Sequence, residues 1–336
     1  MYLKLIPDSE QNIFQYYGIP YYVYVSLSNI CNANCQFCGT YKTKEKHNKI
    51  NLYNLIDELA KNRTKYIHFT GGGEPFVNKD IVNYMEYAKS KNIKVVFTSN
   101  GLALNEGIIK RIVQNIDFCF FSIDGHCAEI HNTLRGTNEI FERATNNINL
   151  IKQYNQKTKI VLNHVLNVKN IVFFDKFIQM KTWLNFDFIN PIVVKDNPVL
   201  FPNAMQIEHF NNNLNLYYQL ANDYNIKFLG KNLELFDNDY NRNINDDIKC
   251  VYPSFCAFID CPTGNVYPCD CSMWRDPELY KIGNLIENNF TEIWNSEKKQ
   301  QIQEMLKQQK MSCVQKCDES NCLFNRKYEL FGRREK

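Results

Sequence analysis

Apolar, strand-like segments alternate with amphipathic, helix-like segments along this chain from about residue 20 to residue 190. The strand candidates are rich in Val, Ile, Phe and Tyr, as expected for strands that are buried on both faces. They cover residues 21–27, 65–69, 93–98, 117–122, 158–165 and 186–190. The helix candidates cover residues 51–62, 79–91, 105–114, 138–154 and 170–180. Such repeated units predict a parallel α/β sheet with its functional site at the carboxyl ends of the strands.

The composition of the chain changes after this region. A Pro- and Asn-rich linker is followed by a predicted helix, a short predicted strand and an Asn/Asp-rich loop, at residues 204–223, 226–229 and 237–247. Beyond them, eight of the thirteen Cys lie between residues 250 and 322. We therefore expect three parts, comprising residues 1–200, 201–249 and 250–336.

Three cysteines with CxxxCxxC spacing follow the first predicted strand. They are Cys31, Cys35 and Cys38. Thiolates are the usual ligands of iron–sulfur clusters, and a structural cluster usually takes four of them. Three thiolates would leave one iron of a 4Fe-4S cluster open to a small molecule, so the spacing points to chemistry as well as to metal binding. Taken alone, the spacing would also suit a zinc knuckle.

Four motifs in this order resemble the radical SAM superfamily, in which S-adenosylmethionine binds the open iron. The first is the cysteine motif, with Phe37 before the third Cys. The others are TGGGEP at residues 70–75, TSNG at residues 98–101, and SIDG at residues 122–125 followed by His131, Arg135 and Gly136. They are similar to the "GGE" segment, the "TNG" turn and the "SIDG…H…RG" stretch of members with extra clusters. The resemblance implies a partial (β/α)6 TIM-like barrel.

The resemblance also implies a binding site for S-adenosylmethionine. Its expected residues are Phe37, Gly71, Gly72, Gly73, Glu74, Ser99, Asn100, Ser122 and Arg135. The glycines would allow close approach of the backbone to the ligand, since they carry no Cβ. Arg135 would bind the carboxylate with help from Ser122, while Ser99 and Asn100 would lie near the ribose. The reduced cluster would cleave S-adenosylmethionine to a 5′-deoxyadenosyl radical, which would take a hydrogen atom from the substrate.

The C-terminal cysteines resemble SPASM/twitch domains, which carry auxiliary 4Fe-4S clusters. Cys250, Cys256, Gly264 and Cys269 match the opening of that pattern. The later cysteines depart from its spacing; they are Cys313, Cys317 and Cys322. One auxiliary cluster is expected from Cys250, Cys256, Cys269 and either Cys317 or Cys322. A second would be possible if Cys261 and Cys271 also served, and a structural zinc is the alternative.

A cysteine S–H near the barrel mouth could also return a hydrogen atom to a substrate radical, as an epimerase requires. The candidates are Cys127, Cys261 and Cys271. For each of them a buried or incidental thiol is the simpler interpretation. Cys119 is expected in the core, and His68 and His131 are expected to be satisfied or exposed rather than ligands. Asp124 is interpreted as a turn residue before Gly125.

The bulk properties exclude several classes of protein. The net charge is +3 without a long basic run, so no nucleic acid is implied. The N-terminal residues lack a signal-peptide core, and no stretch approaches the length that crosses a bilayer. A cytoplasmic protein is expected, and for its thirteen Cys metal or cluster ligation is a better account than disulfides. An electron donor such as flavodoxin or ferredoxin is the expected partner.

The expected reaction is oxidation, cross-linking or epimerisation of a peptide or protein residue. Dehydrogenation or epimerisation of a sugar or aminocyclitol is the alternative. About thirty residues precede Cys31, so a fused peptide-recognition domain is not expected. A non-catalytic iron–sulfur or zinc scaffold is a second alternative, which would give no 5′-deoxyadenosine.

Overall fold

The computed structural model describes residues 17–38, 47–194, 197–229, 233, 250 and 252–308. One ten-stranded sheet, of order β10-β9-β8-β1-β2-β3-β4-β5-β6-β7, forms its centre. The strands are β1 (Tyr22–Ser26), β2 (Tyr66–Thr70), β3 (Lys94–Ser99), β4 (Ile116–Ser122), β5 (Lys159–Leu166), β6 (Phe188–Val193), β7 (Lys227–Phe228), β8 (Cys256–Asp260), β9 (Asn265–Tyr267) and β10 (Gly283–Asn284). Strands β1 to β7 pair with one another in parallel, and β8 pairs in parallel with β1. The β8–β9 and β9–β10 pairs are antiparallel. The six predicted strands are therefore confirmed as β1 to β6.

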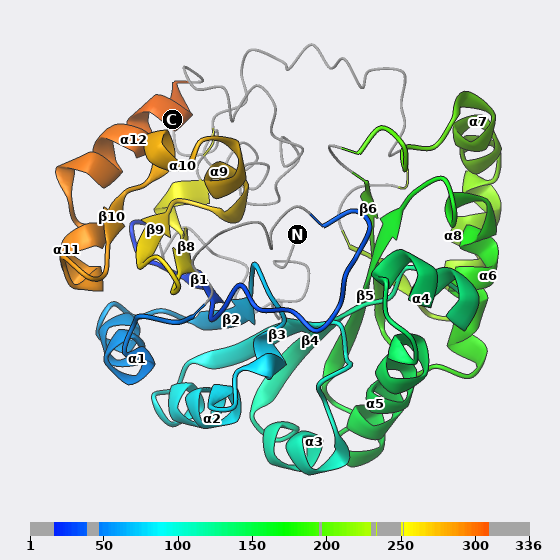
Figure 1. Ribbon diagram of the computed structural model, residues 1–336, viewed down its shortest axis with the longest axis horizontal. Helices are drawn as coiled ribbons and strands as arrows, with labels where there is room; N and C mark the ends of the chain where they lie inside the picture. Colours follow the sequence, from blue (N-terminus) through cyan, green and yellow to red (C-terminus); the bar gives the residue numbers. More distant parts are fainter. Residues whose placement is uncertain are drawn as a thin grey trace.

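The sheet is curved, and α1, α2, α3 and α5 lie along its outer side (Figure 1). The α-helices are α1 (Leu52–Lys61), α2 (Ile81–Ser90), α3 (Glu106–Ile112), α4 (Ala128–Arg135), α5 (Ile140–Tyr154), α6 (Phe174–Gln179), α7 (Ala204–Asn212), α8 (Leu214–Asp223), α9 (Asp270–Arg275), α10 (Pro277–Tyr280), α11 (Phe290–Trp294) and α12 (Glu297–Lys307). Short 3-10 turns are η5 (Pro75–Val77), η6 (Ile171–Phe173), η7 (Met180–Thr182) and η8 (Tyr252–Ser254). This arrangement is an α/β fold of the expected partial-barrel type.

Helix α1 shows how the sequence produces this packing. The side chain of Asn51 caps its first turn by accepting hydrogen bonds from the N–H groups of Tyr53 and Asn54. Its buried residues recur at helical spacing; they are Leu52, Leu55, Ile56 and Leu59. The apolar face packs on the sheet, and the opposite face meets solvent.

A buried polar cluster around His68 is internally hydrogen-bonded. His68 Nδ1 lies 2.9 Å from Tyr22 Oη, and His68 Nε2 lies 2.8 Å from Thr98 Oγ1. Burial lowers the pKa of His68 to about 3, so this imidazole is neutral at physiological pH. His68 is therefore a satisfied core histidine, as expected from the sequence.

The cysteine-rich segment continues the sheet of the barrel. Strand β8 pairs in parallel with β1, from Tyr22 opposite Cys256 to Ser26 opposite Asp260. In addition, the hydroxyl groups of Tyr24 and Tyr252 lie 2.8 Å apart. The proposed division into residues 1–200, 201–249 and 250–336 stays a prediction. The first and third of these parts share one hydrogen-bonded sheet, because β8 pairs with β1.

Two helical predictions differ from the structure. The single helix expected over residues 204–223 is two helices, α7 and α8, which meet at Asn213. The side chain of Asn213 donates a hydrogen bond to His209 O at 2.7 Å, and an Asn that bonds the backbone in this way favours a helix end. Helix α4 was not expected at all. The predicted loop at residues 237–247 lies outside the described residues.

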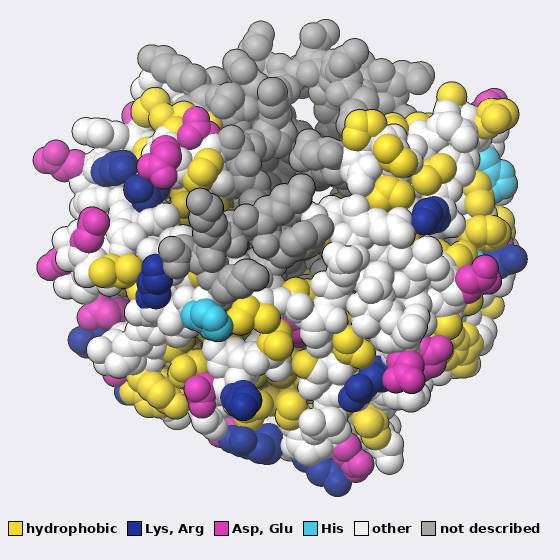
Figure 2. All heavy atoms as spheres, in the orientation of Figure 1, with side chains coloured by type: hydrophobic (Ala, Val, Ile, Leu, Met, Phe, Trp, Pro, Cys, Tyr) yellow, Lys and Arg dark blue, Asp and Glu magenta, His cyan; other side chains and the backbone are white. Residues whose placement is uncertain are grey.

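No helix within the described residues combines the length and the apolar character needed to span a bilayer. Positive and negative side chains are interspersed on the face shown in Figure 2, without a broad area of one sign over the described part.

Candidate functional site

The cysteine motif forms a loop directly after β1. Cys35 is 7% exposed, whereas Cys31 and Cys38 are half-buried. The last turn of α4 holds the loop, because the N–H groups of Asn34 and Gln36 donate to Arg135 O and Leu134 O, each at 2.9 Å. The structure thus fixes the backbone of the three thiols against a helix end, although helix α4 was not visible in the sequence.

The glycine segment packs on the residues that lead into this loop. A Cβ at Gly71 would lie 2.2 Å from Ser26 Oγ, and one at Gly73 would lie 2.1 Å from Ile30 O. A Cβ at Gly72 would lie 1.9 Å from Asn29 Oδ1. The sequence suggested that these glycines make room for a ligand. In the structure the close approach that excludes a side chain is made by residues 26–30 of the protein itself.

Glu74 joins the glycine segment to the end of β3. It is 3% exposed, and its carboxylate accepts hydrogen bonds from Ser99 Oγ at 2.7 Å and Asn100 N at 2.8 Å. Burial raises the pKa of Glu74, although the hydrogen bonds from Asn100 and Ser99 act in the opposite direction. These contacts hold the glycine segment against the end of β3, while the expected part of Glu74 in binding S-adenosylmethionine stays a prediction.

Asn100, which follows Ser99, connects Glu74 to the cysteine loop. The hydroxyl of Ser99 also accepts a hydrogen bond from Gly101 N at 2.9 Å, and the side chain is 1% exposed. Asn100 Nδ2 donates to Asn32 Oδ1 at 2.8 Å and lies 3.9 Å from Cys31 Sγ. The geometry thus links Asn100 to the first thiol, while the expected contacts with a ribose stay a prediction.

Arg135 and Asp124 form a buried ion pair beside the second thiol. Arg135 Nη2 lies 2.5 Å from Asp124 Oδ2, and Arg135 Nη1 lies 3.5 Å from Cys35 Sγ. The Phe37 ring centroid is 5.3 Å from Arg135 Cζ, a cation–π distance. Asp124 is completely buried and ion-paired, so the interpretation of this residue as a simple turn residue does not account for its contacts. The expected carboxylate-binding role of Arg135 stays a prediction.

Two asparagines that sequence reasoning missed line up with Ser122 across the sheet. Ser122 on β4 is paired with Asn163 on β5, and Asn163 with Asn190 on β6. Asn190 Nδ2 donates to Asn163 Oδ1 at 2.8 Å, and Asn190 Oδ1 is buried without a hydrogen-bond partner among the described residues. Polar residues inside the apolar runs KIVLNHVL and FINPIV were the available signal.

The thiol set fits an iron–sulfur cluster. Three sulfur ligands suit iron, and ligation requires them as thiolates. Burial raises the pKa of both Cys31 and Cys35, but the adjacent Arg135 guanidinium favours the Cys35 thiolate. Within the described ranges, no three Cys, His, Asp or Glu side chains are grouped so as to hold a single metal ion.

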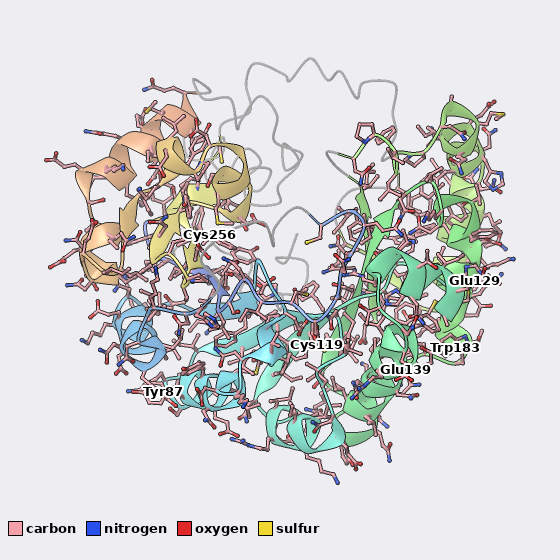
Figure 3. All side chains as sticks on the ribbon, viewed as in Figure 1. Tyr87, Cys119, Glu129, Glu139, Trp183 and Cys256 are labelled. Carbon is pink, nitrogen blue, oxygen red and sulfur yellow. The ribbon has the colours of Figure 1, made fainter. Side chains whose placement is uncertain are left out.

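The C-terminal cysteines are only partly described. Cys256 lies buried on β8, as labelled in Figure 3, while Cys250 and Cys269 are half-buried. The remaining proposed ligands lie outside the described residues; they are Cys313, Cys317 and Cys322. The proposed ligand set of an auxiliary cluster therefore stays a prediction.

The three candidate hydrogen-atom donors differ in their surroundings. Cys127 precedes α4 and is half-buried. Cys261 is fully buried, and its burial raises the pKa of the thiol well above its ordinary value, which favours a packing role. The side chain of Cys271 lies outside the described residues. Cys119, expected in the core, is fully buried on β4 (Figure 3).

Two protein families match this chain. The radical SAM superfamily matches residues 25–172, and the SPASM iron–sulfur cluster-binding domain matches residues 250–323. This chain carries a radical SAM domain followed by a SPASM domain. It is a radical SAM enzyme with a C-terminal SPASM domain, and its cofactors are S-adenosylmethionine, a 4Fe-4S cluster and at least one auxiliary 4Fe-4S cluster.

Curated relatives share modest identity with this radical SAM enzyme. A cysteine-type anaerobic sulfatase-maturating enzyme of Clostridium novyi (strain NT) is 24% identical over 295 residues, which cover 80% of this chain and 77% of the relative. The mycofactocin maturase MftC of Mycobacterium tuberculosis is 27% identical over 158 residues, 45% of this chain and 39% of the relative. The chain thus spans less than half of the second protein.

Solved structures share the fold. The structure of anSMEcpe with bound AdoMet has a TM-score of 0.66 at 18% identity and covers 94% of this chain and 97% of that one. Streptococcus suis SuiB bound to precursor peptide SuiA has a TM-score of 0.60 at 16% identity and covers 85% of this chain and 67% of that one. At these identities the likeness shows the fold.

Proposed function

We propose that this radical SAM enzyme oxidises, cross-links or epimerises a residue of a peptide or protein. The observation that carries the radical reaction is the three-cysteine loop at the end of β1, held by α4 and lying against the buried Arg135. The peptide substrate is supported by similarity to a sulfatase-maturating enzyme along 80% of the chain. It is also supported by the shared fold with anSMEcpe bound to the Cp18Cys peptide and with SuiB bound to SuiA.

The protein would hold its cofactors through two sets of residues. When bound, the reduced cluster and S-adenosylmethionine supply a 5′-deoxyadenosyl radical that takes a hydrogen atom from the substrate. Cys31, Cys35 and Cys38 are the proposed ligands of that cluster. The proposed residues around the cosubstrate are Phe37, Gly71, Gly72, Gly73, Glu74, Ser99, Asn100, Ser122 and Arg135.

The chain's own contacts explain how such a site stays in place. Glu74 ties the glycine segment to the end of β3, while the last turn of α4 ties down the cysteine loop. The row of Ser122, Asn163 and Asn190 offers polar groups on three neighbouring strands, at the carboxyl end of β4 and within β5 and β6. These groups would orient bound molecules by hydrogen bonds.

The proposed auxiliary cluster would take Cys250, Cys256, Cys269 and either Cys317 or Cys322. It would receive the second electron in an oxidation. Flavodoxin or ferredoxin is the proposed electron donor, and the cytoplasm is the proposed compartment because thiols stay reduced there.

The radical reaction is tested by cleavage of S-adenosylmethionine. The anaerobically reconstituted protein is incubated with dithionite and S-adenosylmethionine, and 5′-deoxyadenosine and iron are measured in the wild type and in a Cys31→Ala/Cys35→Ala/Cys38→Ala variant. We expect 5′-deoxyadenosine from the wild type, and auxiliary iron without turnover from the variant. Wild-type protein that holds iron or zinc without cleaving S-adenosylmethionine would instead be the scaffold.

The substrate class is tested separately. Peptides containing each reactive side-chain type and a panel of aminocyclitols are added in heavy water. A peptide product should have lost two hydrogens if it is oxidised or cross-linked, or gained one deuterium if it is epimerised. If only an aminocyclitol changes and raises 5′-deoxyadenosine formation, the peptide proposal is wrong and the sugar alternative holds.

A further inference from the structure

The Arg135 guanidinium contacts a proposed cluster ligand through one nitrogen and a buried carboxylate through another. One nitrogen lies 3.5 Å from Cys35 Sγ, and the other lies 2.5 Å from Asp124 Oδ2. The side chains of Arg135 and Asp124 are 10% and 0% exposed. A charge-assisted hydrogen bond to sulfur in such surroundings is screened very little by water.

Asp124 is held so that it directs this guanidinium. Its Oδ1 accepts a hydrogen bond from Val165 N on β5 at 2.7 Å. Its backbone N–H donates to His131 Nδ1 at 2.9 Å, and its backbone oxygen accepts from Asn170 Nδ2 at 2.8 Å. With its backbone and side chain both fixed, Asp124 determines where the second branch of the Arg135 fork points.

The histidines near the pair do not add charge. Burial lowers the pKa of His131 well below its ordinary value, and the Arg135 charge acts in the same direction. Burial also lowers the pKa of His164 to about 4. Both imidazoles are therefore neutral at physiological pH, so the charges of Asp124 and Arg135 dominate the field at Cys35 from this side.

We propose that Asp124 and Arg135 are positioning residues that set the reduction potential of the cluster bound by Cys35. Reduction adds one electron from an external donor to the cluster, so its sulfur ligands become more negative. A hydrogen bond and a positive charge at a ligand sulfur stabilise that reduced state, and both are known means of tuning cluster potentials. The Asp124 carboxylate partly offsets the positive charge while it aims the guanidinium. The inference rests on the proposed ligation by Cys35.

Three variants separate the effects. Arg135→Gln removes the charge and the donor, whereas Asp124→Asn keeps an acceptor for Val165 N but removes the negative charge. The double variant removes both charges, leaves no unpaired buried ion and keeps the fold testable if Arg135→Gln does not fold. Arg143→Gln, at an exposed arginine of the neighbouring helix α5, is the matched control.

The measurement is a redox titration of the cluster signal by electron paramagnetic resonance, without S-adenosylmethionine. The spectrum of the Cys31→Ala/Cys35→Ala/Cys38→Ala variant is subtracted to remove auxiliary clusters. Arg135→Gln should make the cluster about tenfold harder to reduce, which is about 59 mV for a one-electron couple. The double variant should shift in the same direction, Asp124→Asn should shift in the opposite direction, and Arg143→Gln should match the wild type.

Opposite shifts are the decisive result, because damage to the fold would not give opposite signs. Equal potentials in all variants, or shifts of Asp124→Asn and the double variant in the same direction, would overturn the inference while leaving the proposed function intact. If the triple cysteine variant keeps the whole signal, Cys35 is not a ligand, and both proposals fail.

Discussion

The change Gly73→Ala should loosen the loop that carries the three cysteines. A Cβ at residue 73 would lie 2.1 Å from Ile30 O and 2.7 Å from Ser28 O, and both are backbone atoms. The same carbonyls accept hydrogen bonds from Glu74 N and Gly73 N, each at 2.9 Å. The methyl group can therefore be accommodated only if residues 28–30 move and these hydrogen bonds lengthen.

The cost follows from those contacts. Forcing a methyl group into a packed site costs about 1–3 kcal/mol. Each weakened hydrogen bond is worth about 0.5–1.5 kcal/mol. Together we expect a loss of about 2–6 kcal/mol in the free energy of unfolding. Because Cys31 directly follows the displaced residues, the reconstituted protein should also hold less iron.

The matched control is the same substitution at Gly107. This glycine is exposed in α3, where its nearest neighbour is a side-chain atom, Asn105 Oδ1, at 3.3 Å. Gly107→Ala should change stability by no more than about 1 kcal/mol. Urea unfolding of the apoprotein followed by circular dichroism, together with iron analysis after reconstitution, measures both effects. If Gly73→Ala unfolds at the same urea concentration as the wild type and binds as much iron, the packing argument is refuted.

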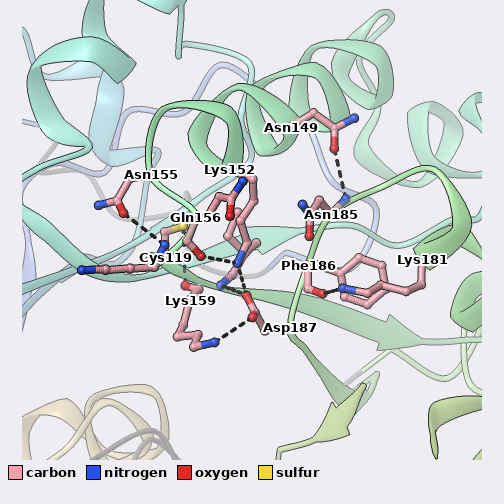
Figure 4. Close-up of polar contacts among 12 residues, drawn as sticks. Cys119, Asn149, Lys152, Asn155, Gln156, Lys159, Lys181, Asn185, Phe186 and Asp187 are labelled. Carbon is pink, nitrogen blue, oxygen red and sulfur yellow. Dashed lines mark hydrogen bonds and ion pairs between the residues drawn. The ribbon is translucent and has the colours of Figure 1, made fainter. Parts of the chain in front are cut away.

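The remaining predictions concern other buried groups. Asp187 binds the buried Lys152 at 2.6 Å and the more exposed Lys159 at 3.0 Å (Figure 4), so Asp187→Asn should lower stability by about 3 kcal/mol and Lys159→Met by less than about 1 kcal/mol, measured by urea unfolding. Burial raises the pKa of Asp187, but the Lys152 contact and other hydrogen bonds outweigh it and hold the pKa below 3.8. The wild type should thus lose this stabilisation as the pH falls below that value, and Asp187→Asn should not. The pKa of His68 is about 6.5 in the unfolded chain and about 3 in the folded protein, so between these pH values only the unfolded chain is protonated at His68. Stability should therefore fall on acidification by about 1.4 kcal/mol per pH unit for this group, and thermal melts of His68→Gln should show a weaker dependence. If the reaction is an epimerisation with the half-buried Cys127 as hydrogen-atom donor, Cys127→Ala should still form 5′-deoxyadenosine but should lose deuterium incorporation into the product, as followed by mass spectrometry. Unchanged incorporation would remove Cys127 as a donor.

The sequence predicted the elements that local patterns encode. Strands β1 to β6 were visible because parallel strands buried on both faces are continuous apolar runs, as in Phe118–Phe121 of β4. The motif residues could be placed at strand ends for the same reason. Helix α4 was missed because its sequence, AEIHNTLR, is only eight residues long and mainly polar. Contacts of its last turn with the cysteine loop accompany it in the structure.

Long-range contacts could not be predicted in this way. Asp124 before a glycine has a sufficient local explanation as a turn residue, so its buried pairing with Arg135 was missed. The glycines were assigned to a ligand because their neighbours, Ser26, Asn29 and Ile30, lie more than forty residues earlier in the chain. The pairing of β8 with β1 likewise has no local signal. Motif spacing and secondary-structure propensity carry no information on which distant segments of the chain lie close together in space.

The position of β1 between β2 and β8 has a consequence for synthesis of the protein. Strand β8 leaves the ribosome roughly 230 residues after β1, which corresponds to on the order of 10–50 s at ordinary rates of translation. During that time one edge of β1, with its sequence YVYVS, has no partner strand. Unpaired apolar edges recruit strands from other chains. A nascent chain, or a version truncated before residue 250, should therefore aggregate unless a chaperone covers that edge.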